Sequence, residues 1–112
     1  MLKTKGLTKI YRSADGATTR ALSDVSLEFA DRGLVCVLGE SGSGKTTLLN
    51  MLGAEDRPDA GSVEADGRDL ADMSERERDA YRGSRVACAH QRGDLLPHLT
   101  VQANAELGLM LA

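Results

Sequence analysis

Aromatic residues are scarce in this sequence: Tyr11, Phe29 and Tyr81 are the only three, and tryptophan is absent. The formal net charge is −3, so there is no excess of positive charge. Proteins that hold single-stranded nucleic acid combine a basic groove with aromatic rings on which the bases stack. Because the sequence provides neither feature, we expect no nucleic-acid partner.

Long hydrophobic runs are missing as well. The longest uninterrupted apolar run is Leu-Val-Cys-Val-Leu at residues 34–38. A membrane-spanning helix needs roughly 20 apolar residues. The N-terminal residues 1–5 also lack the apolar segment of a secretory signal. We therefore expect a cytoplasmic chain without direct membrane insertion, which reaches the inner face of the cell membrane only through a partner.

Cysteine is limited to two residues, Cys36 and Cys88, and each lies in an apolar stretch. Free cysteine behaves as a small hydrophobic residue, and disulfides are rare in the cytoplasm. The sequence therefore predicts two buried side chains without a disulfide between them.

The first third of the sequence favours β-structure. At 112 residues the chain is long enough for one small domain. Residues 2–12 and 21–29 are predicted strands, with the hairpin signal Asp15-Gly16 between them. Residues 34–38 are apolar on both faces, which predicts a buried parallel strand.

The rest of the chain alternates predicted helices and strands. These are a helix over 45–52, a hairpin over 61–69 with its turn at Asp66-Gly67, a helix from Ser74 to about Arg82, a strand over 85–90 and a final helix capped by Thr100. Ser74 and Glu77 have the spacing of a capping box. The final helix reaches the end of the sequence without a stop signal, which indicates a truncated chain.

The most specific motif is G-x-x-x-x-G-K-[ST]. It comprises Gly39, Glu40, Ser41, Gly42, Ser43, Gly44, Lys45 and Thr46, between the predicted strand over 34–38 and the helix over 45–52. Glycines let successive backbone N–H groups point into one concavity, and the start of the helix adds the positive end of its dipole. Lys45 places a positive charge on the β- and γ-phosphates, and the Thr46 hydroxyl is a magnesium ligand. The motif predicts binding of ATP with Mg²⁺.

Further segments of the sequence extend this pattern. They are Tyr11 with ALSDVSL at 21–27, the run TLLNMLG at 47–53 after the motif, PDAGSV at 58–63, and Gln91 with DLLPHLTV at 94–101. With these segments the chain resembles, from end to end, the N-terminal half of an ATP-binding-cassette (ABC) transporter ATPase subunit. Within that family it looks most like the subunits of lipoprotein release and macrolide export.

The resemblance implies a fold and an activity. The fold class is α/β, a P-loop NTPase fold of the ABC ATPase type in which an antiparallel β region lies beside an incomplete parallel core. Residues 1–112 would form the N-terminal part of a single nucleotide-binding domain. The family's signature motif, its Walker B strand with the catalytic glutamate, and its switch histidine lie beyond residue 112. We therefore expect an ATPase of a transporter, but no turnover by these 112 residues alone.

The resemblance also implies roles for individual residues and partners. Tyr11 would stack on the adenine, and the phosphate-binding segment would extend to Thr47. Gln91 falls on the Q-loop glutamine, whose amide oxygen reaches the magnesium ion, so Lys45 and Gln91 are the candidate catalytic residues and Thr46 and Gln91 the metal ligands. The implied partners are a transmembrane permease subunit and a second ATPase subunit, in a homodimer or heterodimer.

Two alternatives remain at this stage. One is a truncated nucleotide binder that does not hydrolyse ATP. The other is a different P-loop enzyme such as a small kinase, which needs a substrate lid rich in basic residues. The only candidates for such a lid are Arg76, Arg78 and Arg82, and they alternate with acidic residues, which favours a solvated helix.

Overall fold

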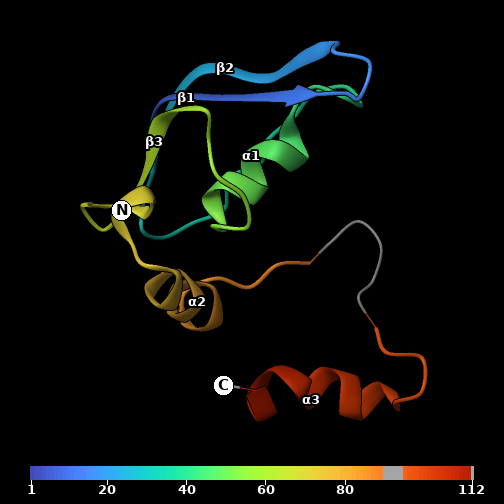
Figure 1. Ribbon diagram of the computed structural model, residues 1–112. Helices are drawn as coiled ribbons and strands as arrows, with labels where there is room; N and C mark the ends of the chain where they lie inside the picture. Colours follow the sequence, from blue (N-terminus) through green and yellow to red (C-terminus); the bar gives the residue numbers. More distant parts are fainter. Residues whose placement is uncertain (90–94, 112) are drawn as a thin grey trace.

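A small antiparallel sheet forms the body of the molecule, with one helix beneath it (Figure 1). The structure is a computed structural model, and it describes residues 1–89 and 95–111. The elements are β1 (Leu2–Arg12), β2 (Thr18–Phe29), α1 (Lys45–Leu52), β3 (Ala60–Ala65), β4 (Arg68–Asp69), the 3-10 turn η1 (Leu70–Asp72), α2 (Glu75–Ser84) and α3 (Val101–Leu111). The strand order is β2-β1-β3-β4, and every neighbouring pair is antiparallel. In Figure 1, α3 lies apart from the sheet.

Local signals in the sequence place several turns and helix ends correctly. The Gly16 N–H donates to the Ser13 carbonyl at 3.0 Å in the β1–β2 turn. The Ser74 hydroxyl accepts from the Glu77 N–H, and the Glu77 carboxylate accepts from the Ser74 N–H at 2.7 Å, which completes the capping box of α2. The Thr100 hydroxyl accepts from the Ala103 N–H at 3.0 Å at the start of α3. These predictions are confirmed because their signals act over a few residues.

The core lies between the sheet and α1. Leu7 and Met51 are fully buried, and Leu22, Leu48 and Val63 are nearly so. Burial of such a side chain contributes roughly 1.5–3 kcal/mol. The apolar face of α1 therefore packs against the sheet.

Two predicted strands, the parallel strand over 34–38 and the strand over 85–90, are not formed. Residues 34–38 have no strand partner, and Leu34 and Leu38 are each 90% exposed. Residues 85–89 are also outside any strand, and residue 90 is outside the described part. A strand of this kind forms only when parallel neighbours supply hydrogen bonds and cover both faces. In the described part of the chain the only sheet is the antiparallel one, so no such neighbours are present.

Three predictions of side-chain burial are also wrong. Cys36 and Cys88 are exposed free thiols, because the strands expected to bury them are not formed. Arg78, expected on a solvated helix, is only 4% exposed, because its face of α2 turns toward the end of α1.

Among the described residues, no helix is long and apolar enough to cross a bilayer.

Candidate functional site

The glycine-rich loop rests on β2 and leads directly into α1. Gly44 has φ +100°, a conformation that L side chains rarely adopt, and it is the N-cap of α1. A Cβ at this position would lie 2.4 Å from the Ala21 carbonyl oxygen on β2. Only glycine therefore allows the loop to approach the strand this closely.

The front of the loop is tightly curled. The Ser43 N–H donates to the Glu40 carbonyl at 3.1 Å, and Gly42 has φ +81°. A Cβ on Gly39 would lie 2.5 Å from the Ser43 hydroxyl oxygen. The two positions require glycine for different reasons. Gly42 adopts a positive φ, whereas Gly39 leaves no Cβ to collide with the Ser43 side chain.

Lys45 is the first residue of α1, and its side chain bends back over the loop. Its ammonium donates to the carbonyl oxygens of Gly39 at 2.5 Å and Glu40 at 2.7 Å, and to the Ser43 hydroxyl at 3.3 Å. The positive charge is thus held at the concave side of the loop by groups that carry no formal charge. Because none of these partners is a carboxylate, they do not neutralise the Lys45 ammonium. Its positive charge would therefore attract an anion that enters the loop.

The N-terminus of α1 lacks a cap of its own. Among the residues that the structure describes, no side chain caps its free N–H groups, and its first turn contains no acidic residue. Free N–H groups and the positive end of the dipole make such a helix start suitable for an anion. The residues present therefore fit a phosphate group.

The remaining predicted phosphate and metal residues are placed as follows. Glu40, Ser41 and Thr46 are exposed, and Thr47 is half-buried. The Thr46 side chain is thus accessible to solvent. Gln91, predicted as the second metal ligand and as a catalytic residue, lies outside the described residues.

Tyr11 lies near the turn end of the β1–β2 hairpin, 41% exposed. It pairs across the hairpin with Thr19, two residues before the Ala21 carbonyl that the loop contacts. The Lys9 ammonium lies 5.4 Å from the centre of the Tyr11 ring. The structure therefore places an exposed aromatic ring and the glycine-rich loop at the same end of the hairpin.

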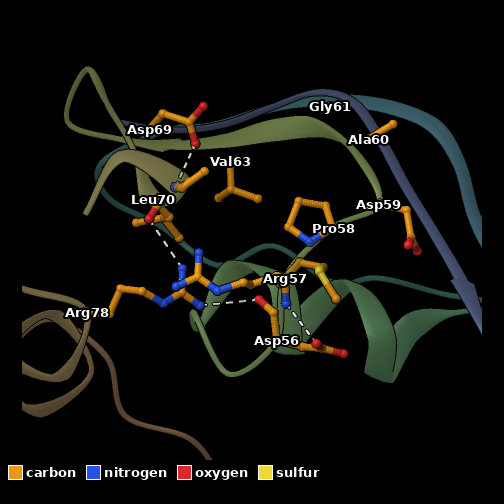
Figure 2. Close-up of a pocket in the computed structure, with 12 residues that line it drawn as sticks. Asp56, Arg57, Pro58, Asp59, Ala60, Gly61, Val63, Asp69, Leu70 and Arg78 are labelled. Atoms are coloured by element: carbon orange, nitrogen blue, oxygen red, sulfur yellow. Dashed lines mark hydrogen bonds between the residues drawn. The ribbon is translucent and has the colours of Figure 1, made fainter. Parts of the chain in front are cut away.

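A second group of contacts, not anticipated from the sequence, surrounds the opposite end of α1. Arg78 donates to the carbonyl oxygens of Ala54 at 2.8 Å, Asp56 at 3.4 Å and Leu70 at 3.3 Å. Arg78 lines a pocket of about 170 Å³ together with residues of α1, the segment 56–59, β3, β4 and η1 (Figure 2). Burial lowers the pKa of the Arg78 guanidinium from its ordinary value. The alternating charges of α2 gave no indication of this burial.

The solved structures that resemble this chain are ABC cassettes. The dimeric structure of the ATP-binding cassette MJ0796 in a post-hydrolysis state, bound to ADP and Pi, matches with a TM-score of 0.90 at 34% identity. The match covers 99% of this chain and 47% of that one. The expected fold class, an α/β P-loop fold of the ABC ATPase type, is thereby confirmed, although the described residues of this chain form its antiparallel sheet and no parallel strand pair.

The sequence comparisons identify the family. A family model described as ABC transporter matches residues 22–110, and this chain belongs to that family. The lipoprotein-releasing system ATP-binding protein LolD of Chromohalobacter salexigens is 40% identical over 111 residues, which cover 99% of this chain and 46% of the relative. The macrolide export ATP-binding/permease protein MacB 1/2 of Paracoccus denitrificans is 37% identical over 107 residues, covering 96% and 16%. The chain thus spans about half the length of the LolD relative, and the small-kinase alternative is not favoured.

Proposed function

We propose that residues 39–47 bind the triphosphate of ATP. The observation that carries this proposal is the uncapped start of α1, from which the Lys45 side chain bends back over the glycine-rich loop. Phosphate oxygens would accept from the free N–H groups of the loop and helix start, and Lys45 would exchange its carbonyl partners for the β- and γ-phosphates. The ring of Tyr11 would stack on the adenine.

We propose Mg²⁺ as the accompanying ion, with the Thr46 hydroxyl and the Gln91 amide oxygen among its ligands. Magnesium prefers oxygen ligands and usually combines one or two protein groups with phosphate oxygens and water. The exposed hydroxyl of Thr46, directly after Lys45, fits that role. When bound, the ion would neutralise charge on the phosphates during transfer to water.

At the level of the whole protein, we propose a transporter ATPase. The named relatives are a lipoprotein-releasing ATP-binding protein and a macrolide export ATP-binding/permease protein, and the similar solved structure is a dimer. By analogy, residues 1–112 would be the nucleotide-binding N-terminal part of one cassette domain. The complete subunit would pair with a second ATPase subunit, bind a transmembrane permease subunit at the inner face of the membrane, and couple ATP hydrolysis to transport.

Two glycine variants test the binding proposal. Gly44→Ala and Gly16→Ala both place a side chain where φ is positive, but only Gly44 lies in the loop and against Ala21. We expect Gly44→Ala to lose most of its affinity for a fluorescent ATP analogue with magnesium, and Gly16→Ala to bind as the wild type does. Equal affinities in the two variants, with both folded by circular dichroism, would refute phosphate binding by this loop.

A further inference from the structure

The C-terminal end of α1 lacks positive charge of its own. Its last turn contains no basic residue, although the carbonyl end of a helix carries partial negative charge. The carbonyls beyond the last turn also need donors once they are removed from water. The donors come from another helix, α2.

Three side chains on one face of α2 hold these carbonyls. The Tyr81 hydroxyl donates to the Leu52 carbonyl at 3.0 Å, and the Arg82 guanidinium donates to the Ala54 carbonyl at 2.6 Å. Arg78 donates to the same Ala54 oxygen at 2.8 Å. Residues at positions i, i+3 and i+4 lie on one helix face, so the three act on α1 together. We name Arg78, Tyr81 and Arg82 the α2 clamp.

Arg78 is the central member of the α2 clamp. It is 4% exposed, and the ion pairs of the described residues do not include it. A buried charge without a carboxylate partner is costly, so an apolar residue would be the less costly choice for simple packing. The cost is offset by the hydrogen bonds that Arg78 donates to the carbonyls of Ala54, Asp56 and Leu70. These bonds connect the segment after α1 to η1 (Figure 2).

The turn that the α2 clamp holds is itself strained. Ala54 has φ +59°, in the left-handed region that alanine seldom adopts. Its N–H donates to the Met51 carbonyl at 3.2 Å, and the next N–H, of Glu55, donates back to Asn50 at 2.9 Å. Besides these backbone bonds, the two arginines on the Ala54 oxygen tie this turn, and with it the end of α1, to α2.

We propose that Arg78 is a positioning residue for the phosphate loop and acts on it through α1. The helix has eight residues and is about 12 Å long, with Lys45 at its first position and the α2 clamp just beyond its last. It is buried along one side by Leu48 and Met51, so it moves as a rigid body rather than bending. A shift at the clamped end therefore displaces Lys45 and Thr46 relative to the loop. This inference rests on the proposed function only for its consequence in ATP binding.

The test compares Arg78→Met, which replaces the guanidinium with a shorter, uncharged and flexible side chain, with Arg78→Lys and with Arg76→Met at an exposed position of the same helix. Backbone amide NMR spectra recorded without nucleotide report on the loop directly. We expect Arg78→Met to shift the amide resonances of Gly42 and Gly44, and Arg78→Lys to shift them less. The turn glycine Gly16 of the β1–β2 hairpin should be unaffected in both, and Arg76→Met should change none of the three.

Titration with a fluorescent ATP analogue gives the second readout. We expect Arg78→Met to bind about five-fold more weakly, a factor in the range of one helix-terminus charge interaction. Should Arg78→Met not fold, Tyr81→Phe removes a single hydrogen bond of the α2 clamp and should shift the same two amides by a smaller amount. A lower melting temperature with unchanged loop amides would overturn the proposal in either variant. If Arg78→Met shifts these amides but the wild-type chain binds no ATP, the proposed function is refuted and the positioning role stands.

Discussion

Replacing Lys45 with alanine removes the only formal positive charge of the glycine-rich motif. In the free loop the ammonium already has three partners, of which the Gly39 and Glu40 carbonyls are the nearest. Nucleotide binding would exchange these neutral partners for charged phosphate oxygens. Hydrogen bonds to charged groups contribute roughly 1.5–3 kcal/mol, so we expect the affinity for ATP with magnesium to fall roughly ten- to a hundred-fold.

The same variant should remain almost as stable as the wild type. The contacts of Lys45 with the two carbonyls are exposed, so water replaces the lost donor, and the free energy of unfolding should change by less than about 1 kcal/mol. Fluorescence titration with a labelled ATP analogue measures the affinity, and thermal unfolding measures the stability. Affinity and stability should therefore respond differently to this substitution.

Lys5→Ala is the matched control. It makes the same change in net charge, but Lys5 is an exposed residue of β1 whose ammonium contacts Glu64. A general effect of charge on ATP attraction would appear equally in both variants. Equal affinity in Lys45→Ala and Lys5→Ala would refute the role assigned to the Lys45 ammonium.

Three further predictions concern stacking, turnover and pH. Tyr11→Ala should weaken ATP and GTP binding alike, by on the order of 1 kcal/mol, while Tyr11→Phe should be nearly silent; a Phe variant as weak as the Ala variant would contradict stacking. The 112-residue chain should release no phosphate above a Lys45→Ala background in a steady-state assay, because no carboxylate is placed by motif to orient the attacking water. Joining the chain to the C-terminal half of a related cassette should restore turnover. In that longer protein, Gln91→Ala should reduce the turnover. The pKa of Glu77 lies below its ordinary value, chiefly through the Ser74 N–H and then Arg68, so its stabilising effect is present at neutral pH and lost as pH falls through that lowered pKa. Melting temperatures of the wild type and Glu77→Gln should therefore converge in acid, and a constant difference across pH would exclude this linkage.

Short-range patterns were sufficient for much of the fold. The extent of β1, the turns at Asp15-Gly16 and Asp66-Gly67, and the capping box at Ser74 follow from residues only a few positions apart. The start of α1 directly after Gly44 belongs to the same group. Such features depend on backbone preferences and local hydrogen bonds, which the sequence specifies without reference to the rest of the molecule.

The predictions that depended on distant partners were less successful. Residues 34–38 have the composition of a buried strand, but composition does not supply the parallel neighbours on which such a strand depends. Cys36 is exposed for the same reason. The alternating charges of α2 predicted a solvated helix, yet the positions of Arg78, Tyr81 and Arg82 on one face become significant only when the carbonyls of α1 lie opposite.

The sequence by itself was sufficient to propose the chemistry of the site, because the order of glycines, Lys45 and Thr46 matches a phosphate loop. Only the tertiary structure decided how that loop is held. It showed that Gly44 is required by the Ala21 carbonyl of β2, and that the far end of α1 is held by Arg78 from α2. Both contacts join residues more than 20 positions apart, and contacts at that separation are set by how the chain packs rather than by its local pattern.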